Sequence, residues 1–122
     1  MSSMDVVQFE HYSIVLLTTP ANAPTFSEAE RGRLQDAHLA YLADLHDEGH
    51  LLAVGPLSDP DGELRGLSIL NVDAAHARAL KEADEAVQAG VFDVRAIPWT
   101  VPAGAMQFRH TRLPRSMSDV VG

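Results

Sequence analysis

Cysteine is absent from the 122 residues of this chain. The absence excludes disulfide bonds, a thiolate nucleophile and zinc held by cysteine, and it fits the reducing environment of the cytoplasm. Apolar runs are short: residues 14–17 and 51–54 fall far below the roughly 20 residues that span a bilayer. Residues 1–8 lack a basic segment followed by an apolar one, so we expect no secretory signal. We therefore expect a cytoplasmic protein without a membrane partner.

Positive charge is scarce in this sequence. The chain has 9 lysines and arginines against 17 aspartates and glutamates, which gives a formal net charge of -8. A field of this sign repels phosphate backbones, so we expect no nucleic-acid partner. Neither a glycine-rich phosphate loop with its lysine nor a dinucleotide-binding fingerprint occurs, and we expect no cofactor.

The length of the chain is that of one domain with its own hydrophobic core. Runs of β-branched, aromatic and apolar residues predict strands, and apolar residues at three- and four-residue spacing predict helices. The expected elements are strands at 11–18, 50–57, 64–72 and 92–101 and helices at 27–48 and 74–87. Their order, βαββαβ, is that of a ferredoxin-like α+β subunit, in which helices cover one face of an antiparallel sheet.

Local signals support several of these boundaries. Ser27 precedes Glu30 by three positions, which is the capping-box pattern of a helix start, and Gly49 supplies the stop. The segment 59–62, Asp-Pro-Asp-Gly, predicts a turn between antiparallel strands, and Gly66 indicates a bulge or a close backbone approach. The predicted helices leave the other face of the sheet bare, so we expect a homodimer in which two sheets stack.

The chain divides into three expected segments: a flexible N-terminus at 1–10, the ferredoxin-like domain at 11–101 and a basic C-terminal extension at 102–122. Against a single acid, Asp119, the extension carries Arg109, His110, Arg112 and Arg115. Two interpretations of the extension are open. It is either a solvated tail, or an arm that crosses the acidic partner subunit or caps its pocket.

His38 is the leading candidate for chemistry, because it lies on the apolar stripe of the first expected helix. Burial lowers the pKa of an imidazole and a neighbouring carboxylate raises it, so a group in such a place can be tuned for proton transfer near neutral pH. A histidine in this setting is also a common type of hydrogen-bonded core residue. The same stripe carries Leu34, Tyr41, Leu42 and Leu45.

The other histidines and a turn serine form weaker candidate sites. His46 and His50 are four residues apart, a spacing used by metal ligands on a helix, but Gly49 ends the helix between them. We therefore expect no metal site. The segment 55–58, Gly-Pro-Leu-Ser, resembles a phosphate turn but lacks a following helix, so a strand-ending turn is the better interpretation. Ser58 has no adjacent base in the sequence.

The segment 37–57, AHLAYLADLHDEGHLLAVGPL, resembles the YCII-related (YciI-like) family. The similarity continues through 61–62, Gly66 and residues 84–99, where AGVF and IPW resemble the closing motif of that family. It covers residues 11–101.

The resemblance implies a dimeric α/β-barrel built from two ferredoxin-like subunits. It also implies a His-Asp pair in a cleft, with His38 on the first helix and Asp84 after the second. In such a pair the carboxylate orients the imidazole and stabilises its protonated form. The aspartate of the family is commonly followed by proline, whereas Glu85 follows it here, so the second helix could continue through Asp84 and redirect the carboxylate.

We assign catalysis to His38 and Asp84, and substrate binding to Tyr41, Gly55, Pro56 and Ser58. Three functions stay open. The chain is an enzyme that moves a proton on a small organic substrate, as a lyase, isomerase or dehydrochlorinase does, or a non-catalytic dimeric module that binds a small molecule or regulates a partner enzyme. The third possibility is a purely structural dimer. A relative within the family eliminates chloride from a hydroxylated aromatic, so the resemblance implies that this scaffold can host such chemistry.

Overall fold

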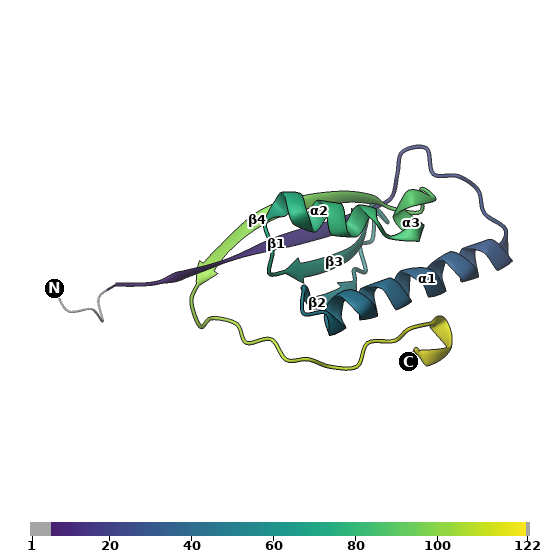
Figure 1. The fold of residues 1–122 in the computed structure, drawn as a ribbon. Helices are drawn as coiled ribbons and strands as arrows, with labels where there is room; N and C mark the ends of the chain where they lie inside the picture. The colour runs from purple at the N-terminus through teal and green to yellow at the C-terminus, as the bar shows by residue number, and fades with distance from the viewer. Residues whose placement is uncertain (1–5, 122) are drawn as a thin grey trace.

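The computed structural model describes residues 6–121 and consists of one antiparallel sheet with helices packed on it (Figure 1). A 3₁₀ turn, η2 (Met117–Asp119), lies near the C-terminal end. None of the helices in the described range combines the length and the hydropathy that a bilayer crossing requires. Before η2 the elements are β1 (Phe9–Thr18), α1 (Glu28–Asp47), β2 (Leu51–Pro56), β3 (Leu64–Leu70), α2 (Ala74–Glu82), α3 (Glu85–Gln88) and β4 (Asp93–Pro102).

The strands lie in the order β2-β3-β1-β4, and every neighbouring pair is antiparallel. This arrangement is ferredoxin-like, so the predicted α+β class is confirmed. β1 begins at Phe9, two residues before the predicted start, and residues 1–5 of the expected flexible N-terminus lie outside the described residues. The register of β1 with β3 shifts just past the pair formed by Leu17 and Gly66, where the glycine predicts an irregularity.

The core lies between one face of the sheet and the helices. Alternate residues of β1, namely Ser13, Val15 and Leu17, are buried on this face. Leu42 and Leu45 join Val15 in one cluster of buried side chains, because their spacing puts both leucines on the same face of α1. The apolar stripe of α1 therefore faces the sheet, as the sequence predicts.

The opposite face of the sheet carries none of the described helices. On β1 the residues that alternate with the buried ones are only partly buried, and the strand register places apolar residues of neighbouring strands beside them. An apolar surface of this kind is typical of a protein–protein interface. This open face consists of Tyr12, Ile14, Leu16, Leu67, Ile69, Ile97 and Trp99.

The region 74–87 differs from the single helix that the sequence predicts. α2 ends at Glu82, and α3 begins only at Glu85. Between them Asp84 is extended, with φ -67° and ψ 128°, and its side chain caps α3 by accepting a hydrogen bond from the Ala86 amide. Because aspartate competes with helical hydrogen bonds in this way, the prediction of a helix that continues through Asp84 is wrong. The break forms without a proline.

After β4 the chain runs back along α1 (Figure 1). Contacts with Asp47, Asp44 and Asp36 of the helix follow in that order along the segment. We name residues 103–121 the C-terminal strap. The strap packs on its own chain, so it is not the free, solvated tail that was one interpretation of the sequence.

Candidate active site

His38 and Asp84 meet in the interior of the protein. Nδ1 of His38 lies 2.5 Å from Oδ2 of Asp84, and the two side chains are 8% and 1% exposed. His38 comes from the buried stripe of α1, and Asp84 comes from the break between α2 and α3. A contact between an imidazole and a carboxylate at this distance fixes the orientation of the ring.

The start of α3 holds the Asp84 carboxylate in place. Its Oδ1 accepts the hydrogen bond from the Ala86 amide at 2.9 Å, which leaves Oδ2 for His38. The guanidinium of Arg33 on α1 lies 2.8 Å from the carboxylate of Glu85 on α3. Glu85 therefore links the two helices, although an exposed ion pair of this kind adds little free energy.

Lys81 is a second buried titratable side chain close to Asp84. Its side chain is 0% exposed, and its Nζ has no hydrogen-bond partner within the described residues. Burial lowers the pKa of Lys81 from 10.5 to about 8, and attraction to the Asp84 carboxylate opposes this shift. Asp84 thus neighbours two side chains that can carry positive charge, His38 and Lys81.

A cavity of about 560 Å³ opens beside His38, between α1, the β2–β3 hairpin and the C-terminal strap. Its volume is in the range of sites that hold small molecules. The polar side chains that line it are Gln35, His38, Arg65 and Ser68. Its apolar wall includes Leu39 and Leu42 of α1, Val54 and Leu57 of the hairpin, and Leu113 and Met117 of the strap.

One nitrogen of His38 is available to a molecule in this cavity. Nδ1 contacts Asp84, while Nε2 has no hydrogen-bond partner within residues 6–121, and His38 lines the cavity. Phe92 packs beside the imidazole with the two ring centroids 5.2 Å apart. The ring is therefore held by a carboxylate and by an aromatic side chain, with Nε2 left for a ligand.

The family model of the YCII-related domain matches residues 12–100, a span that contains both His38 and Asp84. The chain belongs to the YCII-related family. This confirms the family resemblance seen in the sequence. No curated protein matches the chain at a significant level. The C-terminal strap lies beyond the end of the matched YCII-related domain.

Within the YCII-related domain, the structure brings four of the predicted site residues together. His38, Gly55 and Pro56 line the cavity, and Asp84 contacts His38 without lining it. Gly55 and Pro56, the last two residues of β2, thus face the same space as the imidazole.

Tyr41 and Ser58, the other two residues assigned to substrate binding, do not line the cavity. The Tyr41 hydroxyl donates a hydrogen bond to the Leu80 carbonyl at 2.5 Å, which ties α1 to α2. Burial, together with the charges of Asp84 and Glu48, raises the pKa of Tyr41, so this donor keeps its proton. Ser58 is exposed just after β2.

Sequence reasoning allowed the extension to cap the pocket of a partner subunit, but it did not place the extension in the wall of the cavity of its own chain. Its apolar residues Leu113, Pro114, Met117 and Val120 line the cavity from outside the YCII-related domain. The interpretations of this segment rested on its basic residues alone. The sequence signal for this role was the apolar residues placed among the basic ones. A fully solvated tail does not bury such side chains and so gains no free energy from them.

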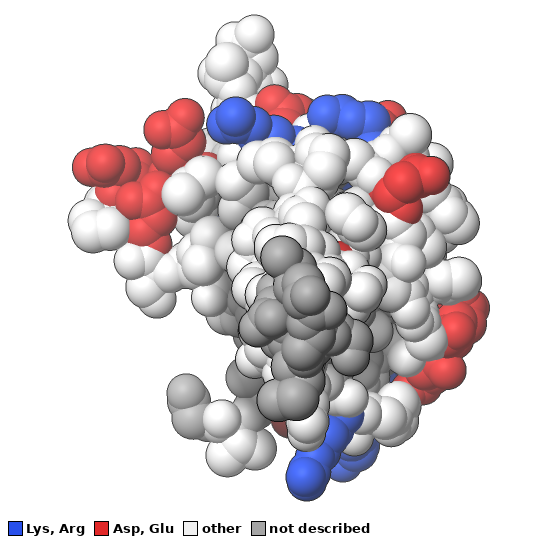
Figure 2. Space-filling view, turned by 90° about the vertical axis from the view of Figure 1, so that its left-hand side faces the viewer, with Lys and Arg blue, Asp and Glu red and all other residues white. Residues whose placement is uncertain are grey.

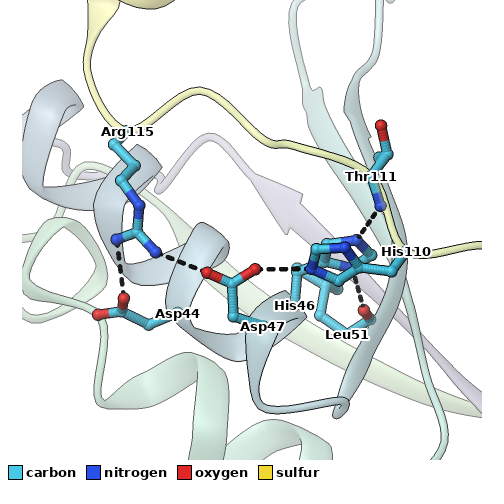
Figure 3. Close-up of polar contacts among 7 residues, drawn as sticks. All are labelled: Asp44, His46, Asp47, Leu51, His110, Thr111 and Arg115. Carbon is cyan, nitrogen blue, oxygen red and sulfur yellow. Dashed lines mark hydrogen bonds and ion pairs between the residues drawn. The ribbon is translucent and has the colours of Figure 1, made fainter.

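A network of ion pairs holds the strap on α1 (Figure 3). Arg115 lies 2.9 Å from Asp44 and 2.7 Å from Asp47, and His110 contacts the other oxygen of Asp47 at 2.8 Å. His110 above all, and Arg115 as well, keep the pKa of Asp47 below its usual value of 3.8. Several exposed charges in one network attach a segment more firmly than separate pairs do.

His46 also fastens the strap, through backbone groups (Figure 3). Its Nδ1 donates to the Leu51 carbonyl at 2.6 Å, and its Nε2 accepts a hydrogen bond from the Thr111 amide at 3.0 Å. These two partners assign the neutral ring with its proton on Nδ1. The ring of His110 stacks on that of His46 with centroids 4.7 Å apart. His46 therefore joins α1, β2 and the strap.

Proposed function

We propose that this YCII-related protein catalyses proton transfer on a small organic molecule in the cavity, with His38 as general acid and base. The observation that carries the proposal is the buried contact between His38 and Asp84 at the wall of a cavity of small-molecule size. A buried carboxylate is costly unless it is paired. Because the Asp84 carboxylate contacts Nδ1 of His38, Nε2 is left to act on a ligand.

The chemistry follows from the two ring nitrogens. Asp84 accepts a hydrogen bond from the Nδ1–H group, so the neutral ring presents an unprotonated Nε2 to the cavity. Nε2 takes a proton from a C–H or O–H group of the ligand, and Asp84 stabilises the imidazolium that results. The proton then returns to a different atom of the ligand in an isomerisation, or to a leaving group in an elimination. Neither reaction requires a further reactant.

Deuterium exchange into candidate ligands in deuterium oxide tests for proton transfer before the reaction is known. The panel consists of small ketones, 2-keto acids and hydroxylated aromatics, and NMR follows their exchanging C–H groups. We expect the wild type to speed exchange in at least one class, and His38→Gln to slow it by about two orders of magnitude or more. His76→Gln, at an exposed histidine of α2, is the matched control and should leave the rate unchanged.

Asp84→Asn tests the pair in the same assay. Its Oδ1 can keep the hydrogen bond from the Ala86 amide, so its amide group would face His38 and donate to Nδ1. The ring would then carry its proton on Nε2 and could not act as a base, so exchange should fall by about as much as in His38→Gln. The nitrogen-15 chemical shifts of the imidazole report this change of tautomer.

Two outcomes contradict the proposal. If the wild type catalyses no exchange but binds panel members, and binding survives His38→Gln, the protein is a non-catalytic binding module. If Asp84→Asn changes neither the tautomer nor the rate, Asp84 has no part in the mechanism.

A further inference from the structure

The charges around the cavity differ from those of the molecule as a whole. The chain contains 17 aspartates and glutamates, and Figure 2 shows separate groups of acidic side chains around one end of the protein. None of the described residues that line the cavity at His38 is acidic, and Arg65 is the one lysine or arginine among them. The cavity wall therefore contains a guanidinium and no carboxylate side chain, although the protein as a whole is acidic. A wall of this kind favours a negatively charged ligand.

Arg65 is oriented but not neutralised. Its guanidinium carbon lies 5.5 Å from the centre of the Phe92 ring, which is a cation–π contact. Within the described part of the chain no carboxylate lies at ion-pair distance from Arg65, whereas Arg33 and Arg115 each contact two carboxylates. Phe92 therefore directs a guanidinium whose hydrogen-bond donors are available to a ligand.

The same aromatic ring connects Arg65 with the proposed catalytic residue. Phe92 packs against His38 as well, and all three side chains line the one cavity. A single small ligand that lies along Phe92 can thus contact the guanidinium at one end and Nε2 of His38 at the other.

We propose that this cavity takes a small organic monocarboxylate, whose carboxylate binds Arg65 and whose reactive group meets His38. The proposal rests on the function proposed above and names the class of substrate. A planar guanidinium binds a carboxylate through two parallel hydrogen bonds. One arginine balances one negative charge, and a phosphate dianion would keep an uncompensated charge among apolar walls.

The apolar walls of the cavity determine the hydrocarbon part of this ligand. Leu42 and Val54 on one side and Leu113 and Met117 of the strap on the other offer apolar contact. Such walls gain free energy by covering a ring or a branched hydrocarbon. The expected ligand is therefore a carboxylate on an apolar body.

Matched acids and amides test this class on the full chain. The probes are phenylacetate and 3-phenylpropionate, with phenylacetamide and 3-phenylpropionamide as neutral counterparts, titrated by NMR. We expect the acids to bind about tenfold more tightly than the amides and to shift resonances of His38 and Phe92. Arg65→Gln, at an exposed side chain, should abolish this preference by weakening the binding of the acids. Arg95→Gln, at an exposed arginine paired in register with Leu16 of the open face, should preserve it.

Three results overturn the proposal: equal binding of acids and amides, acid binding that survives Arg65→Gln, and failure of both acids to bind at about 10 mM. The two proposals fail separately. If the acids bind in a way that depends on Arg65 but the protein catalyses no deuterium exchange, the proposed ligand class is supported and the proposed catalysis is contradicted. If the protein catalyses deuterium exchange of neutral ketones in a way that depends on His38 but binds neither acid, the proposed catalysis is supported and the proposed ligand class is contradicted.

Discussion

Lys81 is the single lysine of the chain, and its ammonium group is buried without a hydrogen-bond partner in the described structure. Burial favours the neutral amine and lowers the pKa of Lys81 to about 8. At neutral pH the folded protein therefore contains a charged group that is more stable in the unfolded chain. Attraction to Asp84 offsets only part of this cost.

Lys81→Met should raise the free energy of unfolding at pH 7, by at most about 3 kcal/mol if the whole cost of the shifted pKa is recovered. The unfolded chain keeps this proton up to about pH 10.5, and the folded protein keeps it up to about pH 8. The wild type therefore gains stability as the pH rises through this window, and the advantage of methionine shrinks.

Urea unfolding at pH 7 and at about pH 9.5 measures both effects. Arg78→Met, at an exposed cation of the same helix, is the control and should show neither. A loss of stability in Lys81→Met at pH 7 would mean that the ammonium has a compensating partner.

Single residues also differ in how far the sequence could predict them. The apolar stripe singled out His38, because periodicity along a helix is a local pattern. Asp84 came only from the family resemblance, since its contact with His38 joins positions 46 residues apart. Lys81 was not predicted, because lysine is ordinarily a surface residue. Arg65 was not predicted either, because its importance depends on which residues surround the cavity.

Among the elements, the C-terminal strap is the one whose attachment depends most on charge. Arg115→Gln removes the contacts with Asp44 and Asp47 and should speed amide hydrogen exchange at 110–120, while the sheet keeps its protection. Arg112→Gln changes an exposed arginine of the same segment that has no ion pair within residues 6–121, so it is the matched control. Equal acceleration across the whole chain would show that Arg115 stabilises the fold rather than the strap.

The same network gives the strap a dependence on pH. His110 and Arg115 lower the pKa of Asp47 in the folded protein. The stability that its carboxylate adds to the attachment of the strap is therefore complete above the usual pKa of 3.8. This stability is lost as the pH falls through the lower pKa of the folded state. Exchange protection of the strap should therefore persist to about pH 4 and weaken as the pH falls further.

The elements show where local patterns stop being sufficient. Alanine-rich sequence predicted one helix over 74–87, whereas the Asp84 side chain ends α2 by capping α3. In the strap the basic residues were visible in the sequence. Their partners on α1 were not, because they lie 63 to 71 positions away.

For the whole molecule, the open face of the sheet is the main unassigned surface. We expect two chains to pair through it, since apolar residues of three strands lie together there. Sedimentation at micromolar concentration should give a dimer, and Ile69→Glu, on β3 of this face, should give a monomer. Val121→Glu places the same charge at a side chain that is 95% exposed and should stay dimeric. A monomeric wild type would contradict the pairing.

The class and the order of elements could be predicted because each strand and helix carries its own periodicity, and βαββαβ leaves few ways to form a sheet. The part of the cavity wall that the strap forms could not be predicted, because it depends on the path that the strap takes across α1.

The burial of Lys81 also determines how the protein responds to covalent labelling. Reagents that acylate amines find no lysine on the surface of the folded chain, since the only ε-amino group lies inside, close to Asp84. The rate at which label accumulates on Lys81 would therefore measure how often the protein opens at the place where His38 and Asp84 meet.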